Sequence, residues 1–298
     1  MRLPFQALRA FVEVVEAGSF TRAANNLFIS QPAISKSIRE LEALFEVKLM
    51  DRSHSPVILT DAGNALFTLS KNIFNIEKVI IQDLSQRSQS RLGSLSIGAS
   101  TTIASHWLSH YLVEFSRRYP AVSISVLSGN SQHIAKLLKN GEIDVGVIEG
   151  PIPNEPEIQI INWRKERLVL VAAPHFLEGN TMTNLSALKW IMREEGSGTA
   201  RVTQEYLTKL AIQPVSIIRV ANNLAVLELV RAGLGLALLP EIMIKEKVMH
   251  KELVVIPETL IGMEPFIERE LNWITLTWRH ETPLRKSFKE VLFNFPLA

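Results

Sequence analysis

The segment SQPAISKSIRELEALF, residues 30–45, carries polar side chains of the types that bind DNA. Gln, Lys and Arg side chains can read base edges in the major groove, whereas Ser hydroxyls and the free amides of a helix N-terminus can hold phosphates. Here the polar side chains are Gln31, Ser35, Lys36 and Arg39. They can act together only if one helix presents them on its solvent side.

Apolar residues at spacings of four, three and four predict that this segment is a helix with one buried stripe. The stripe is formed by Ile34, Ile38, Leu41 and Phe45. Ser30 is placed to cap this helix, and Pro32 is tolerated in its first turn. The polar side chains fall outside the stripe, so the pattern predicts that they face solvent.

A second helical pattern ends just before this helix begins. One helix is predicted to end at Gly18, and Ser19 or Thr21 can cap a short helix that follows. Two helices joined by a turn of about three residues, the second with a polar N-terminal face, form a helix-turn-helix, whose second helix enters the DNA major groove. An ordinary three-helix core with a solvated face gives the same pattern, and the residues alone leave both readings open.

The composition sets outer limits. The 298 residues predict about two domains, and a formal net charge of +2 does not by itself indicate nucleic-acid binding. Cys is absent, which excludes disulfides and thiolate chemistry and fits a reducing compartment. Glu13 and Glu16 interrupt the first apolar stretch, and no apolar run is long enough to span a membrane. We therefore expect a cytoplasmic protein with no secretory signal and no membrane partner.

The run AANNLFISQPAISKSIRELEALFEVKLMDRSHSPVILTDAG, residues 23–63, resembles the N-terminal winged helix-turn-helix of LysR-type transcriptional regulators. That family typically shows AAxxLxxSQPAxSxxIxxLExxLGxxLFxR, then a wing, then LTxAG. The resemblance implies double-stranded operator DNA as a partner. The candidate DNA-binding residues that it implies are Ser30, Gln31, Pro32, Ser35 and Lys36, with Arg52 at the base of the wing. Arg39, on the solvent side of the helix, and His54, in the wing, are further candidates.

The sequence departs from the family pattern at three places. Glu46 replaces the glycine after the recognition helix, which removes the easiest helix stop. Met50 replaces a Phe before the wing, which a core tolerates. Ser55 stands where the wing usually carries a second arginine, beside His54, so we expect a weaker or pH-sensitive wing contact.

A long helix is predicted over residues 61–87. Thr60 can cap it, and an apolar residue recurs in a heptad pattern at Ala62, Leu66, Leu69, Ile73, Ile76 and Ile80. The pattern favours pairing with a second copy of the chain, although a helix lying on its own domain is the alternative. A dimer supplies two recognition helices for a two-fold symmetric site. The polar segment SQRSQSRLGS, residues 85–94, reads as a hinge.

Strand and helix patterns alternate after residue 92, which predicts α/β units on a parallel sheet. Two sets of such units are separated by the Pro-rich segment GPIPNEPE and by strands near 158–163 and 167–173. This layout resembles the two lobes of periplasmic binding proteins, which is also the effector domain of LysR-type regulators. We divide the chain into a DNA-binding domain (1–60), a linker helix and hinge (61–90) and an effector domain (91–298), with lobe I at 92–161 and 268–298 and lobe II at 162–267.

Polar and glycine residues follow several predicted strands, where the ligands of open α/β sheets bind. Hydroxyls, glycines and free amides at helix N-termini suit an anion, although plain helix capping explains each residue singly. The candidate effector-binding residues are Ser100, Thr101, Thr102, Ser128, Gly129, Asn130, Glu149, Gly150, Ser197, Gly198, Thr199 and Asn222.

The motifs ASTT, SGNS, IEGP and EEGSGT are similar to those of the LysR branch that senses small inorganic or sulfur-containing anions. The resemblance implies a small anionic effector, and we expect a sulfite-like oxyanion. Glu149 is awkward in an anion site; it could accept a proton from the ligand or bridge to the opposite lobe.

Two other protein classes remain to be weighed: an exported solute-binding protein and an enzyme on the same two-lobe fold. The helix-turn-helix and the expected lack of a signal oppose the first. His106 and His110 lie one helical turn apart but lack the glutamate of a zinc motif, and neither a P-loop nor a catalytic triad is present. We therefore expect a regulator without enzymatic activity, cofactor or metal, which forms a homodimer or homotetramer, with RNA polymerase as a further candidate partner.

Overall fold

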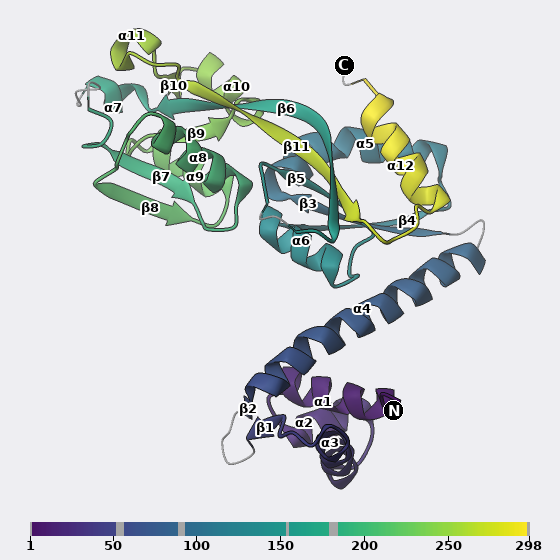
Figure 1. Cartoon of the computed structure of the whole chain (residues 1–298). Helices are drawn as coiled ribbons and strands as arrows, with labels where there is room; N and C mark the ends of the chain where they lie inside the picture. The colour runs from purple at the N-terminus through teal and green to yellow at the C-terminus, as the bar shows by residue number, and fades with distance from the viewer. Residues whose placement is uncertain (1, 52–56, 89–92, 153–154, 179–183, 297–298) are drawn as a thin grey trace. The chain divides into compact units, whose positions relative to one another are not determined.

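Figure 1 shows the computed structural model of the chain, which describes residues 2–51, 57–88, 93–152, 155–178 and 184–296. The chain divides into two compact units, Met1–Leu84 and Ser85–Ala298, which are considered one at a time. Within the described segments, no helix is both long enough and apolar enough to cross a membrane.

Three helices, a short hairpin and a long fourth helix form the N-terminal unit. Their bounds are α1 Phe5–Ala17, α2 Phe20–Leu27, α3 Gln31–Phe45, β1 Met50–Asp51, β2 Ile58–Leu59 and α4 Asp61–Ser88. Leu8, Phe11, Ile34 and Ile38 are fully buried in one core that α1, α2 and α3 share. β1 and β2 pair antiparallel after α3. The structure confirms the helix-turn-helix as α2 and α3, followed by the hairpin of a wing.

The helix boundaries follow from the capping residues. Gly18 ends α1 with φ 64°, and the Ser19 side chain then accepts a backbone N–H at the start of α2. Ser30 Oγ accepts the backbone N–H of Ala33 at 3.3 Å and so caps α3. Glu46 ends α3 in the left-handed region, with φ 55°. The helix thus stops although Glu46 replaces the glycine that would stop it most easily.

The buried stripe of α3 differs from the prediction at its last position. Phe45 is the final helical residue and its side chain is exposed, so the prediction that it is buried is wrong. Glu42 is buried instead, and its Oε1 accepts the backbone N–H of Leu49 at 3.0 Å. The carboxylate satisfies the backbone where the chain turns from α3 toward the wing, which an apolar side chain could not do.

The six predicted heptad positions of α4 do not share one surface. Ala62, Leu66 and Ile73 pack, partly buried, against the core of their own unit. Leu69, Ile76 and Ile80 are exposed by 63%, 42% and 52%. The start of α4 is therefore a packing element of the DNA-binding unit, while its exposed apolar side chains stay available to another chain. Pairing with a second copy stays a prediction.

The second unit contains a seven-stranded mixed sheet, a two-stranded sheet and the helices packed on them. The strands are β3 Ser94–Ser100, β4 Ser123–Gly129, β5 Val145–Glu149, β6 Ile158–Ala172, β7 Lys189–Arg193, β8 Ser216–Val220, β9 Ala237–Pro240, β10 Val254–Val255 and β11 Phe266–Leu276. The helices are the π-helix η1 Ile103–Trp107, α5 Leu108–Arg118, α6 Ser131–Lys139, α7 Pro174–Glu178, α8 Gly198–Lys209, α9 Asn223–Arg231, α10 Glu241–Met249, α11 Glu258–Ile261 and α12 Pro283–Asn294.

The expectation of a parallel sheet is confirmed for only some of these strands. β3 pairs in parallel with β4 and β5, and β7 pairs in parallel with β8. β11 is antiparallel to both β5 and β6, and β9 and β10 are antiparallel to β6. The prediction is wrong for these strands because the chain returns between the lobes through β6 and β11, which run in opposite directions.

β6 is one continuous strand, so the prediction of two strands near 158–163 and 167–173 is also wrong. It pairs with β11 from Ile158 opposite Leu276 to Val169 opposite Phe266. Charged residues between 164 and 167 interrupt the apolar pattern, and the pairing with β11 continues across them after one register shift, between Leu271 and Asn272. Figure 1 shows β6 and β11 running side by side from one lobe to the other. The predicted lobe boundaries, 161/162 and 267/268, fall inside these two strands.

Each lobe has its own core. In lobe I, Ile97 of β3, Trp273 of β11 and Phe288 of α12 are fully buried in one apolar cluster. In lobe II, Trp190 of β7 and Leu170 of β6 belong to another. The two-lobe fold predicted from the alternating pattern is confirmed.

Candidate DNA interface and effector cleft

The start of α3 presents the predicted DNA-binding side chains together. Those that the structure describes are Ser30, Gln31, Pro32, Ser35, Lys36 and Arg39, all exposed except Ser35, which is half-buried. Gln31 Nε2 donates to Ser35 Oγ at 3.0 Å, so one turn of the helix holds a donor and an acceptor side by side. Lys36 Nζ lies 3.7 Å from the Glu40 carboxylate, an exposed pair that holds the lysine only weakly. This surface can meet both base edges and phosphates.

Small residues let α2 lie close to α3. Ala23 and Ala24 of α2 are buried in the shared core. The wing residues Arg52 and His54, with Ser55, lie outside the described residues, and their roles stay predictions.

The strand ends of the second unit meet around one buried carboxylate, Glu149, at the end of β5. Only 1% of this residue is exposed. Thr102 Oγ1 donates to Glu149 Oε1 at 3.1 Å, and Arg269 Nη2 lies 2.7 Å from Glu149 Oε2. The second contact is an ion pair without hydrogen-bond geometry, because Oε2 has no hydrogen-bond partner among the described residues. Glu149 thus faces Arg269 of β11 in its own lobe, and it reaches the opposite lobe through Thr102, whose Oγ1 accepts from Asn223 Nδ2 at 2.8 Å.

Arg269 is shared by two carboxylates. Its Nε donates to Glu166 Oε2 at 2.8 Å, its Nη2 also contacts Glu166, and its Nη1 donates to Thr199 Oγ1 at 2.9 Å. Burial raises the pKa of the Glu149 carboxyl above its ordinary value, and the Glu166 charge acts in the same direction, against the attraction of Arg269. Two buried carboxylates, Glu149 and Glu166, thus share Arg269, and the charge of Arg193 adds a weaker attraction for Glu149.

Hydrogen bonds join the two lobes across this cluster. Asn223 Nδ2, at the start of α9, donates to Thr102 Oγ1 at 2.8 Å. Arg193 Nη1, at the end of β7, donates to Thr101 Oγ1 at 3.1 Å. Asn130 caps α6 and donates through Nδ2 to Glu194 Oε1 at 3.2 Å. The side chains that follow the strands therefore meet those of the opposite lobe.

Glycine allows the closest approach between the lobes. A Cβ atom at Gly198 would lie 1.8 Å from the backbone oxygen of Glu149, so no other residue fits there. Gly150 has φ 69°, which L side chains rarely adopt. Ser131 Oγ donates to the backbone oxygen of Glu149 at 2.9 Å, and Ser197 caps α8. The backbone around Glu149 is thus held from both lobes.

Most of the predicted effector residues converge on the cluster around Glu149, but not all of them. Thr101, Thr102, Asn130, Glu149, Gly150, Gly198 and Thr199 lie in the contacts above, and the buried Ser100 ends the neighbouring strand. Ser197 and Asn222 have their plainest role as helix caps. Ser128 and Gly129 end β4, the edge strand of the sheet, and no contact of theirs reaches the Glu149 cluster within the described residues.

Sequence reasoning missed three charged residues of the cleft: Glu166, Arg193 and Arg269. All three are buried, and each lies within a strand. A charge inside an otherwise apolar strand must be paired, and this signal was available in the motifs WIMREE and RELNWITL.

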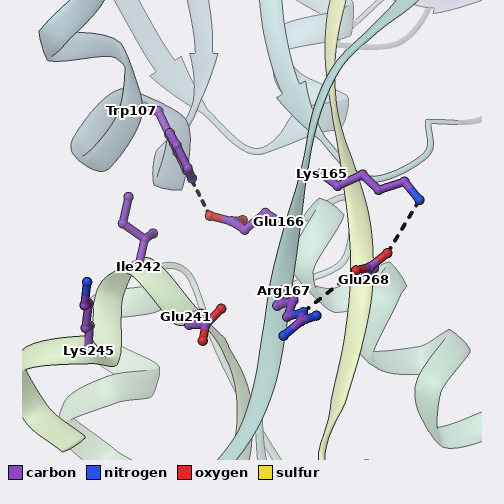
Figure 2. Close-up of a pocket in the computed structure, with 8 residues that line it drawn as sticks. All are labelled: Trp107, Lys165, Glu166, Arg167, Glu241, Ile242, Lys245 and Glu268. Atoms are coloured by element: carbon purple, nitrogen blue, oxygen red, sulfur yellow. Dashed lines mark hydrogen bonds and ion pairs between the residues drawn. The ribbon is translucent and has the colours of Figure 1, made fainter. Parts of the chain in front are cut away.

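A groove of about 570 Å³ opens beside β6 and β11. Figure 2 shows its lining residues, which are Trp107, Lys165, Glu166, Arg167, Glu241, Ile242, Lys245 and Glu268. Trp107 Nε1 donates to Glu166 Oε1 at 2.9 Å, while Lys165 and Arg167 both lie near Glu268 (Figure 2). Glu166 therefore belongs to the groove as well as to the Arg269 cluster.

A helix-turn-helix with a wing and a two-lobe α/β unit define the class of a DNA-binding regulator with an effector domain. Residues 5–64 match the family model described as "Bacterial regulatory helix-turn-helix protein, lysR family", and residues 88–293 match that described as "LysR substrate binding domain". The HTH-type transcriptional regulator CysL of Bacillus subtilis (strain 168) is 30% identical over 294 residues, covering 97% of this chain and 96% of CysL. The chain belongs to the LysR family of DNA-binding transcriptional regulators.

Two solved structures share the fold. Full-length CbnR, a LysR family regulator complexed with its target DNA, superimposes with a TM-score of 0.64 at 22% identity, over 97% of this chain and 99% of CbnR. The regulatory domain of Synechocystis PCC6803 CcmR, in complex with 2-PG, superimposes with a TM-score of 0.59 at 23% identity, over 68% of this chain and 99% of that domain.

Proposed function

We propose that the chain controls transcription by binding specific duplex DNA through α3 and a small anion in the cleft around Glu149. The observation that supports a ligand there is a set of buried polar atoms, Ser100 Oγ, Glu149 Oε2 and Asn223 Oδ1, without a hydrogen-bond partner in the described part of the chain. The Ser100 hydroxyl can donate to an anion, whereas the other two oxygens need a proton on the ligand or on Glu149 itself. Buried polar groups are nearly always satisfied, so a cluster of exceptions at the strand ends is typical of a ligand site.

The site offers groups that can hold an oxyanion, because a hydroxyl donor and an arginine already contact the Glu149 carboxyl group. The Glu149 carboxylate takes a hydrogen bond from Thr102 Oγ1 and the charge of Arg269. A sulfite-like oxyanion presents the same kind of oxygens and competes for the same donors. The 2-PG found in the CcmR regulatory domain is consistent with a small organic or inorganic anion as the effector class.

A carboxyl group is compatible with an anion site when it is protonated, because the neutral group does not repel the anion. Two carboxylates already share Arg269, so a further negative charge is accommodated best when Glu149 is neutral. Burial raises the pKa of Glu149 and so favours that state. A protonated Glu149 donates a hydrogen bond to the bound anion, and Arg269 becomes free to pair with it.

Ligand binding acts on the chain by a shift of population. The effector contacts residues of both lobes, so it stabilises one relative position of the lobes over others. In a dimer this changes how the two recognition helices meet the operator. The chain acts as a binder and switch, without an enzymatic step, which its place in a family of regulators supports.

We further propose an oligomeric state, a protein partner and a cellular location. The exposed Leu69, Ile76 and Ile80 of α4 support a homodimer, with a homotetramer built from it, and RNA polymerase is a further partner. The functional parts are residues 1–60, 61–90 and 91–298, and the protein works in the cytoplasm, where its DNA lies.

A thermal-unfolding titration tests the effector site. All five tryptophans, Trp107, Trp163, Trp190, Trp273 and Trp278, lie in the second unit, so their fluorescence reports its unfolding alone. Sulfite, sulfate, thiosulfate, nitrate and phosphate are compared at fixed ionic strength. A ligand at one hundred times its dissociation constant adds about 2.7 kcal/mol of stability.

Thr102→Val is the matched variant for this titration, and Thr208→Val, on the exposed side of α8, is its control. Thr102→Val removes the donor to Glu149 while keeping the side-chain shape, so the shift produced by the selective anion should disappear in it and persist in Thr208→Val. An equal shift with every anion, or a full shift in Thr102→Val, would refute the site.

A further inference from the structure

Phe28, in the turn between α2 and α3, is the most exposed large apolar side chain in the described residues, at 94%. Its neighbour Ile29 is also exposed, at 45%. Both directly precede Ser30, the cap of α3. An aromatic ring held in water gains nothing for the fold, because folding is driven by removing such surface from water.

The backbone conformation of residue 28 also does not favour a phenylalanine. Phe28 has φ 55° and ends α2 in the left-handed region, which is unfavourable for a bulky L side chain. Its backbone N–H reaches the oxygens of Ala24 and Asn25, so the turn is set by the backbone. Glycine or asparagine would make the same turn with less strain. Neither packing nor the turn accounts for a phenylalanine here.

We infer that Phe28 is a DNA-contacting residue that adds an apolar contact to the polar recognition surface of α3. The inference rests on the proposed function of α3. In a helix-turn-helix the second helix enters the major groove by its N-terminus, and Phe28 lies two residues before Ser30, the N-cap of α3. The apolar groups of DNA within its reach are thymine C5-methyl groups and deoxyribose, and aromatic or aliphatic side chains contact the thymine methyl in other complexes.

Glu46→Gly supplies the matched control for Phe28→Gly. Glu46 ends α3 with the same φ of 55°, so each substitution relieves the same backbone conformation, one at each end of the recognition helix. Both variants should unfold at the same or a higher denaturant concentration than the wild type. Glu46→Gly also removes a negative charge, which can only favour DNA binding.

The test is DNA affinity, measured by fluorescence anisotropy at fixed salt on the duplex that the wild-type protein enriches from a random pool. Phe28→Gly should bind about fourfold more weakly for each methyl-sized contact, the equivalent of ~0.8 kcal/mol. Its salt dependence should match the wild type, because no charge is lost. A duplex with uracil in place of thymine separates the two sources. The loss of affinity caused by Phe28→Gly should disappear on the uracil duplex if Phe28 contacts methyl groups, and it should stay the same if Phe28 contacts deoxyribose.

Phe28→Gly binding as tightly as the wild type would overturn the inference and leave the exposed ring to a protein partner. A changed salt dependence would also overturn it, since this indicates altered docking. Failure of the proposed function looks different, because then the wild type enriches no sequence and Gln31→Ala has no effect on binding.

Discussion

Glu149→Gln tests the charge balance of the cleft. The substitution keeps the size of the side chain and can still accept the hydrogen bond of Thr102, but it removes one of the two carboxylates that share Arg269. Removing one partner of a buried ion pair typically costs about 3–5 kcal/mol, because the other charge is left unpaired. Here Arg269 keeps Glu166 and Thr199, so the loss should be no more than one net hydrogen bond, about 1 kcal/mol.

The pH dependence gives the sharper expectation. Burial raises the pKa of Glu149 in the folded protein above its ordinary 4.5, so between 4.5 and the folded value the folded state binds more protons than the unfolded state. The contribution of Glu149 to the free energy of unfolding is therefore fully present below pH 4.5 and is lost as pH rises, at a rate of up to about 1.4 kcal/mol per pH unit. Glu149→Gln lacks this loss, so the variant should approach or exceed wild-type stability as pH increases.

Urea denaturation followed by tryptophan fluorescence, from pH 4.5 upward, measures this difference in the second unit. Glu268→Gln, an exposed carboxylate on the same strand β11, is the control and should leave the wild-type slope unchanged. Either a loss above about 3 kcal/mol at every pH, or a slope equal to that of the wild type, would refute the reasoning. The first result would mean that Glu149 is an essential ionised partner of Arg269. The second would mean that the pKa of Glu149 is the same in the folded and unfolded states.

Three further changes test other parts of the molecule. Gln31→Ala should reduce the difference in binding free energy between operator and random DNA by about 1–3 kcal/mol. Lys36→Ala should weaken binding to both DNAs alike and reduce the slope of log affinity against log salt concentration by about 0.9. Equal losses on both DNAs for the two variants would contradict these roles. Ile80→Asp should dissociate the dimer in sedimentation while exposed Lys78→Ala does not, and an intact dimer in both would remove α4 from the interface. Gly198→Ala should lower the unfolding midpoint and the anion response together, because its Cβ would meet the Glu149 backbone oxygen at 1.8 Å; an unchanged response would show that α8 can retreat freely.

The N-terminal unit could be predicted closely because its signals are local. Gly18, Ser19 and Ser30 fix helix ends through their own backbone and side-chain geometry. The error at Phe45 arose because apolar spacing does not reveal where a carboxylate such as Glu42 must satisfy the backbone of a later turn. Long-range pairing was the weaker part: β6 reads as two strands because only its partner β11, about a hundred residues later in sequence, keeps it continuous.

The cleft was predictable in its position and less so in its chemistry. Strand ends in an α/β fold meet at one edge, which placed Thr101, Thr102 and Glu149 together. Arg269, which pairs with Glu149, comes from elsewhere, because it lies inside β11. A search confined to strand ends passes over it, although a buried charge within an apolar strand is itself a signal.

Arg269 can transmit the effect of ligand binding near Glu149 to other parts of the fold. It touches Glu149 at the end of β5, Glu166 on β6 and Thr199 on α8, and therefore links lobe I, a crossover strand and lobe II. Glu166 also accepts Trp107 Nε1 beneath the groove of Figure 2. An anion that draws Arg269 toward itself must weaken one of these contacts, and the contact with Thr199 is the one that joins β11 to a helix of lobe II. If the proposed anion binds here, the energy that favours one lobe arrangement is the difference between the pairs that Arg269 makes with and without it.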